Sequence, residues 1–308
     1  MLTLRPMSEA DFEAVARLDV LAFSPYFQQS GVAQELPPRT HDNLRACLNI
    51  FPGGCWVAVA DEKPVGYVFS RVWGKLGWLG VFGVSPEAQG QRIGQQLLAT
   101  VVQALQAAGC ETVGLETMPD SPYNVGLYAS QGFWITAPTL NLHKEFTTPP
   151  PTAAYTCLSD VDLSAALAAV ARVSDAVQPG LDYTAEVGNA HEYQWGETLL
   201  FGWPDTWGFA VIRTIARREG QKVAAAEVCT LAVQPDAKAR YEAALQMVEA
   251  FAAHRGWPKV MLSVNALDGE TLQRTLASGY RVFNVRLRMV YQQGYTQPAG
   301  IDLSRWKM

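Results

Sequence analysis

Apolar and polar positions along residues 1–146 predict alternating strands and helices. Ser8 followed three residues later by Asp11 is a capping pattern that predicts the start of a helix, and short apolar runs predict strands. The predicted elements are a strand at 2–5, the helix that follows Ser8, a helix at 38–48, strands at 56–60, 65–72 and 79–84, a long helix ending at 108, a strand at 112–117, a helix from about 121 and closing strands that end at 146. Strands and helices therefore alternate throughout this segment.

The junction between the strand at 79–84 and the long helix carries the clearest chemical signal. Apolar residues at Leu97, Val101, Val102 and Leu105 define one face of the helix. Gly90 and Gly94 remove two Cβ atoms just before it, so that the backbone can approach an anion at the positive end of the helix dipole. The segment lacks the lysine of a P-loop and the spacing of a dinucleotide fingerprint. It therefore predicts a pyrophosphate-binding loop of another kind.

Two motifs in order resemble the GCN5-related N-acetyltransferases. The first is [RQ]-x-x-G-x-[GA], with Gln89 at its first position, Arg92 where the family usually has Gly, and Gly94 at its last. The second runs from Asn124 to Phe133, with the spacing of Tyr128, Gly132 and Phe133 as its firm part. The resemblance implies a mixed, mostly antiparallel sheet flanked by helices, whose central parallel pair of strands separates to admit acetyl-CoA.

The resemblance also implies roles for particular residues. Main-chain groups of Phe82 and Val84 are expected to pair with the pantetheine arm as an added strand does, and the side chain of Asn124 to meet the same arm. Tyr128 is expected near the thioester sulfur as a general acid. The residues expected to hold the pyrophosphate are Gln89, Gly90, Gln91, Arg92, Ile93, Gly94 and Gln95.

The general base is open at this stage. Glu116, near the end of the strand at 112–117, is a candidate because a carboxylate there can take a proton directly or through water. The alternatives are that Glu116 is a solvated charge at a strand end, that Asp120 acts in its place, or that solvent alone deprotonates the amine.

The chain contains an internal duplication. The segment 147–152, T-T-P-P-P-T, predicts a stiff linker, and the order of predicted elements begins again after it. Gly109 and Gly256 are 147 residues apart, as are Gly132 and Gly279. We therefore predict two tandem domains of the same α+β fold: a catalytic domain at 1–146, the linker at 147–152, and a second domain at 153–308.

The second domain lacks the features of the cofactor site. The segment after Pro235 is two residues shorter than its counterpart and contains no glycine, and Thr271 and Thr275 stand where Asn124 and Tyr128 stand in the first domain. We predict that it binds no cofactor; the alternative is that Lys238 or Arg240 grips a phosphate. Its aromatic residues Tyr193, Trp195, Phe201, Trp203 and Trp207 are expected either in the core or as walls of an acceptor pocket between the two domains.

Composition excludes several classes of function. The chain has 308 residues, 49% of them hydrophobic, and a net charge of −5. Without a basic stripe or a long apolar run, neither nucleic acid nor a membrane is an expected partner. Five scattered cysteines and four histidines form neither a disulfide framework nor a metal site, which favours the cytoplasm and predicts no metal.

These observations leave two function classes. The first is an acetyl-CoA-dependent N-acetyltransferase in which a primary amine of a small molecule or peptide N-terminus attacks directly in a ternary complex. The second is a non-catalytic acyl-CoA-binding sensor or scaffold, for which Arg92 is the relevant departure from the motif. A tandem chain can act as a monomer that is its own pseudo-dimer, or as a homodimer.

Overall fold

The computed structural model describes residues 2–29, 36–148, 150–292 and 296–304. The first half contains β1 (Leu2–Pro6), a 3₁₀ turn (Glu9–Asp11), α1 (Phe12–Gln29), α2 (His41–Ile50), β2 (Trp56–Ala60), β3 (Lys63–Trp73), β4 (Leu76–Val84), α3 (Ile93–Ala107), β5 (Thr112–Thr117), α4 (Pro122–Ser130) and β6 (Phe133–Glu145). The capping box of Ser8 and Asp11 is present, and Asp11 also pairs with Arg5. Local capping and apolar periodicity thus produce the predicted elements.

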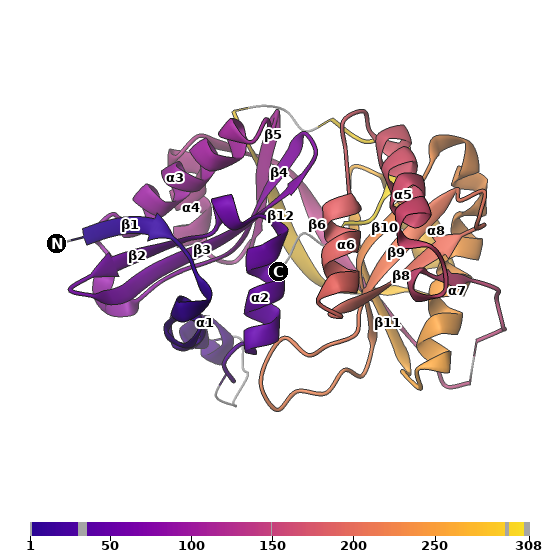
Figure 1. The fold of residues 1–308 in the computed structure, drawn as a ribbon, viewed down its shortest axis with the longest axis horizontal. Coiled ribbons are helices and arrows are strands. Elements are labelled where there is room, and N and C mark those ends of the chain that lie inside the picture. Colours follow the sequence, from indigo (N-terminus) through magenta and orange to yellow (C-terminus); the bar gives the residue numbers. More distant parts are fainter. Residues whose placement is uncertain (1, 30–35, 149, 293–295, 305–308) are drawn as a thin grey trace.

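The second half repeats this order. It contains β7 (Thr156–Cys157), α5 (Leu163–Val177), α6 (Thr184–Glu192), β8 (Gly196–Phe201), β9 (Gly208–Arg213), β10 (Ala226–Val233), α7 (Tyr241–His254), β11 (Lys259–Asn265), α8 (Gly269–Ala277), β12 (Arg281–Tyr291) and β13 (Ile301–Asp302). The tandem mixed fold predicted from the duplication is confirmed (Figure 1).

One continuous sheet runs through both halves, and two of its strands are exchanged. Its order is β1-β2-β3-β4-β5-β12-β6-β11-β10-β9-β8-β7. β12, from the end of the chain, pairs with β5 of the first half, while β6 pairs with β12 on one side and with β11 of the second half on the other. The segment predicted to hold closing strands up to residue 146 is the single strand β6, which lies between two strands of the second half. The division at 147–152 stays a prediction about the chain, since the sheet itself crosses it.

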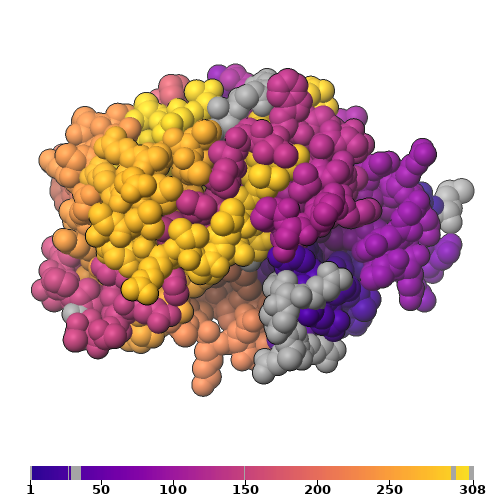
Figure 2. Space-filling view, turned by 180° about the vertical axis from the view of Figure 1, so that it is seen from behind, coloured from indigo at the N-terminus to yellow at the C-terminus, as the bar shows by residue number. Residues whose placement is uncertain are grey.

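Helices cover both faces of the sheet in each half. In the first half α1 and α2 enclose one apolar cluster and α3 encloses another on the opposite face, as the period-2 alternation of the strands requires. Met289 of β12 is fully buried in the α3 cluster, so the second half completes a core of the first. Seen from behind, residues near the yellow end of the chain lie among those of the magenta segment that includes α4 and β6 (Figure 2). The halves are joined by packing as well as by the chain.

The sequence also leads to predictions about disulfides, membrane spans and metal ligands. All five cysteines are free thiols. In the residues that the structure describes, no helix combines the length and apolar character needed to cross a membrane, and no cluster of three or more potential metal ligands occurs.

Candidate functional site

A cavity of about 870 Å³ opens beside the diverging ends of β4 and β5. The walls come from α1, from β4 and the loop after it, from the first turn of α3, from the end of β5 and from α4. Arg39, which precedes α2, and Arg217, Arg218 and Arg286 of the second half also line it. The cavity therefore brings together the two predicted motifs and a third set of residues that the motifs do not include.

The loop before α3 forms a cradle of main-chain groups at one end of the cavity. Gly90 has φ +81° and Arg92, at the N-cap of α3, has φ +60°, both in the left-handed region. A Cβ atom on Gly94 would lie 3.2 Å from Cζ of Phe82, so the absence of a side chain at Gly94 keeps the first turn close to β4. The first amide N–H groups of a helix have no partner within it and attract an anion.

Six of the seven residues predicted for the cradle line the cavity. They are Gln89, Gly90, Arg92, Ile93, Gly94 and Gln95, whereas Gln91 does not line it. The family's glycine at the position of Arg92 has a physical reason here, because the backbone takes a conformation that glycine adopts without strain.

A strand edge of β4 is open along the same cavity. β4 and β5 pair in parallel only from Leu76 with Thr112 to Leu79 with Leu115, and then diverge. Residues 80–84 line the cavity on the side that β5 has left, while their other edge pairs with β3. An extended, amide-containing ligand can add to such an edge as a further strand. Phe82 and Val84, the two residues predicted to pair with the pantetheine arm, both belong to this edge and line the cavity.

Tyr128 sits in the cavity wall with its ring buried. The ring packs against Phe82 and Phe133 at centroid distances of 6.4 and 6.1 Å, and burial raises the pKa of the phenol well above its ordinary value. The hydroxyl therefore keeps its proton at neutral pH. Asn124 lines the same wall one turn before it.

Glu116 lies at the end of β5 in an ion pair rather than in solvent. Its side chain is only 5% exposed, and Oε1 accepts hydrogen bonds from Nη2 and Nε of Arg288 at 3.0 and 3.2 Å and from the hydroxyl of Thr139. Oε2 has no hydrogen-bond partner among the described residues. Asp120 is outside the cavity wall and exposed, with the Tyr26 hydroxyl 3.4 Å from it. Between the two carboxylates, Glu116 alone faces the cavity.

The segment between β9 and β10 docks on the first half and carries two arginines to the cavity. Main-chain bonds join Thr40 to Arg217 and Glu219 to Pro38. The Arg218 guanidinium donates to Asp19 at 2.6 Å and to the carbonyl of Pro37, also at 2.6 Å. This loop, orange in Figure 1, extends beneath α2. No local motif in the sequence marks these arginines.

Asp19 is the buried anchor of that contact. It is fully buried and also accepts hydrogen bonds from Arg39 at 2.8 Å and from the Tyr67 hydroxyl at 2.6 Å. Burial alone would raise its pKa, but the charges of Arg39 and Arg218 and the hydrogen bonds outweigh it and hold the pKa below its ordinary value. The carboxylate is therefore charged, and it ties the two halves together beside the cavity.

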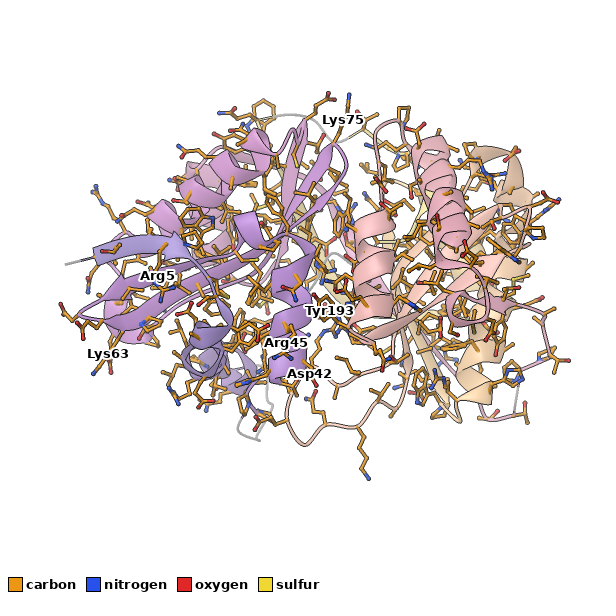
Figure 3. The ribbon with its side chains drawn as sticks, in the orientation of Figure 1. Arg5, Asp42, Arg45, Lys63, Lys75 and Tyr193 are labelled. Atoms are coloured by element: carbon orange, nitrogen blue, oxygen red, sulfur yellow. The ribbon has the colours of Figure 1, made fainter. Side chains whose placement is uncertain are left out.

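The five aromatic residues of the second half do not form an acceptor wall. Trp195, Phe201 and Trp207 are buried in its hydrophobic clusters, and Tyr193 and Trp203 pack against one of them. Tyr193 lies at the boundary between α6 and α2 (Figure 3), but none of the five lines the cavity. The core interpretation is correct, and the second half contributes arginines to the cavity instead.

Comparisons with known proteins agree with this geometry. The acetyltransferase (GNAT) family model matches residues 12–133. A solved structure from Pyrococcus horikoshii is 15% identical, with a TM-score of 0.68 and coverage of 99% of this chain and 95% of that one. A GCN5-related N-acetyltransferase from Sphaerobacter thermophilus is 16% identical, with a TM-score of 0.61 and coverage of 100% and 98%.

A tandem GNAT protein from the clavulanic acid biosynthesis pathway has the same two-part fold. It is 13% identical, with a TM-score of 0.59 over 98% of this chain and 99% of that one. No curated protein matches the sequence. At these identities the structural matches establish the tandem fold alone, and the family match covers the half that holds the cradle and Tyr128.

Proposed function

We propose that this chain, a tandem member of the GNAT superfamily whose family domain lies at residues 12–133, transfers an acetyl group from acetyl-CoA to a primary amine of a small molecule or peptide N-terminus. The observation that carries the proposal is the meeting of three features in one cavity: the cradle at the start of α3, the open edge of β4 and the protonated Tyr128. Together they fit the diphosphate, the pantetheine arm and the sulfur of one extended ligand.

The residues of this chain have separate tasks in the proposed reaction. When bound, acetyl-CoA supplies an activated acetyl thioester. The cradle holds the diphosphate, and the edge of β4 aligns the pantetheine arm. The attacking amine nitrogen forms the new C–N bond while the C–S bond breaks, and Tyr128 donates its hydroxyl proton to the departing thiolate.

The amine must lose one proton, and Glu116 is the proposed acceptor. Arg288 and Thr139 hold its Oε1, which leaves Oε2 to take that proton directly or through water. Tyr128 recovers a proton from solvent. The balanced products are an N-acetylated amine and free coenzyme A.

We further propose that the second half binds no cofactor, and two contacts support this. β10 pairs with β11 only at Ala226 and Glu227, so these strands diverge as β4 and β5 do. The gap is occupied by the end of the chain: β13 pairs with Ala232 and Val233, and Leu303 exchanges two main-chain hydrogen bonds with Leu231. The protein's own backbone thus uses the strand edge that corresponds to the open edge of β4.

A tyrosine occupies the position that corresponds to the cradle glycine. Counting back from the paired residues Gly109 and Gly256, the counterpart of Gly94 is Tyr241. Its ring is fully buried, and its hydroxyl hydrogen-bonds at 2.7 Å with Thr275, the counterpart of Tyr128. The ring fills space that a diphosphate would require.

The test is calorimetry with acetyl-CoA followed by a thiol-release assay with a panel of primary amines. We expect one acetyl-CoA bound per chain and thiol release that depends on the amine. A stoichiometry of two would contradict the account of the second half. Tight binding without release on any amine would favour the sensor.

A matched pair of variants tests the cradle. Gly94→Asp places a negative charge and a side chain at the first turn of α3, and we expect acetyl-CoA to bind at least about tenfold more weakly. Gly269→Asp adds the same group at the first turn of α8, where a Cβ atom meets nothing within 4 Å, and should leave binding unchanged. Equal affinities for the two variants would refute the cradle.

A further inference from the structure

Positive charge dominates the cavity. Among the residues that the structure describes, the lining includes five arginines, Arg39, Arg92, Arg217, Arg218 and Arg286, and the single carboxylate of Glu116. Arg92 belongs to the cradle. The other four come from the segment just before α2, from the loop between β9 and β10, and from β12. They therefore form a separate wall, which we call the arginine wall.

Behind Arg39, Arg217 and Arg218 of this wall lie two carboxylates, and each of them is shared by two guanidinium groups. Asp19 is shared by Arg39 and Arg218, and Glu227 by Arg217 and Arg213. Arg217 reaches Glu227 with two bonds of 2.5 and 2.7 Å, whereas Arg213 is 3.9 Å from it. Each carboxylate thus faces two cations, and each group of three has a net positive charge.

Some buried guanidinium nitrogens at the edge of the wall also lack a hydrogen-bond acceptor in the part of the chain that the structure describes. Nε of Arg217 and both Nε and Nη1 of Arg213 are buried without a hydrogen-bond partner among the described residues. Arg213 lines a small hollow of about 150 Å³ that Arg217 also lines, so Arg217 borders both the hollow and the main cavity. Unpaired donors on a buried guanidinium are costly unless a ligand or water satisfies them.

Neighbouring groups keep the wall rigid. Glu227 holds the Arg217 guanidinium through two hydrogen bonds, and the main-chain bonds of Thr40 and Pro38 hold the loop that carries Arg217 and Arg218. A guanidinium has five N–H groups, so the two bonds that each of Arg217 and Arg218 makes to the protein leave further N–H groups that can donate to the oxygens of a carboxylate or a phosphate.

From this geometry we infer that the acceptor is an amine that also carries an anionic group, a carboxylate or a phosphate, and that Arg217 and Arg218 of the second half bind that group. The inference rests on the proposed function, since it names the substrate class of the same site. The second half then selects the acceptor while the first half holds the acetyl donor. The positive wall also favours the neutral, nucleophilic form of a nearby amine.

The experiment compares matched acceptors on one protein. Calorimetry with coenzyme A present measures the dissociation constants of β-alanine against β-alaninamide, glycine against glycinamide, and phosphoethanolamine against ethanolamine. We expect at least one anionic member to bind about 10- to 100-fold more tightly than its neutral partner, the range for hydrogen bonds to charged groups. The carboxylate pairs and the phosphate pair distinguish the two anions.

Variants then assign the preference to the wall. Arg217→Gln should bring the ratio of the two dissociation constants towards one, and Arg217→Lys should retain part of it. Because both ligands are measured on the same variant, a partly unfolded sample does not change the ratio. The control is Lys63→Gln, which removes one positive charge at an exposed residue that does not line the cavity and should keep the wild-type ratio.

The outcomes separate the two proposals. A wild-type ratio near one in every pair, no binding of any acceptor, or an unchanged ratio in Arg217→Gln would overturn the inference. Preferential binding of an anionic amine without acetylation in the thiol-release assay would uphold the anion site and count against the proposed function alone.

Discussion

Replacing Arg92 with glycine separates backbone strain from phosphate binding at the cradle. Arg92 has φ +60° at the N-cap of α3, and a left-handed conformation costs a residue with a Cβ atom about 1–2 kcal/mol. Glycine avoids that cost but loses about 0.5–1 kcal/mol through the greater freedom of the unfolded chain. We therefore expect Arg92→Gly to be more stable than the wild type by about 0.5–1 kcal/mol.

The matched variant is Arg92→Ala, which removes the same charge and keeps the strain. In thermal unfolding the glycine variant should melt about 2 °C above the alanine variant. Arg92 is exposed, so solvent screens its attraction to a phosphate, and both variants should bind acetyl-CoA about 3- to 10-fold more weakly. Equal melting temperatures for the two variants would refute the strain argument, and wild-type affinity in both would show that the side chain takes no part in binding.

Three further predictions test the acid, the anchor and the strand exchange. Tyr128→Phe should lower kcat about 10- to 1,000-fold with an unchanged dissociation constant for acetyl-CoA, and an unchanged kcat would remove Tyr128 from the mechanism. The pKa of Asp19 is lower in the folded protein than in the unfolded chain, so its contribution to stability is complete above about pH 4 and is lost as the pH falls towards the folded pKa. In denaturant unfolding between pH 3 and 7, the free energy of unfolding should therefore fall less with decreasing pH in Asp19→Asn than in the wild type. An identical fall in the two proteins would contradict this. A fragment that ends at residue 146 lacks β12 and should neither fold nor bind acetyl-CoA, as circular dichroism and calorimetry can show; a folded monomer with wild-type affinity would disprove the need for the exchanged strand.

The parts of the fold that depend on local sequence were predictable. The strands at 56–60 and 112–117 match β2 and β5 in both bounds, because their apolar runs are short and end at turn residues. The cradle was predictable for a similar local reason. Glycines before a helix indicate that the backbone there takes a left-handed conformation or comes close to another group, which a side chain would hinder. The left-handed conformation at Arg92 was signalled by the glycine that the family motif has at that position.

The parts of the site that depend on long-range pairing were not predictable. Glu116 is paired with Arg288, which is 172 residues away in the sequence, and Arg217 and Arg218 reach the cavity only through the docked loop. An alternating strand pattern states which residues face the core but not which neighbour the strand pairs with. The patterns of β6 and β12 do not indicate which half each strand joins, so their exchange is not visible in the sequence.

The strand exchange explains how the second half contributes to the candidate site beside β4 and β5, although β13 occupies the strand edge of the second half that corresponds to the open edge of β4. β12 supplies Met289 to the core beneath α3 and Arg288 to Glu116, and it carries Arg286 into the cavity wall. In the same half, β13 pairs with the edge of β10 that corresponds to the open edge of β4, and the buried Tyr241 stands at the position that corresponds to Gly94. If the proposed function holds, a tandem chain built in this way has one site whose donor side is formed by the first half and whose acceptor side depends on the second. On that proposal we expect that substitutions in residues 214–225 and β12 can change the choice of acceptor without any change in the two motifs proposed to bind acetyl-CoA.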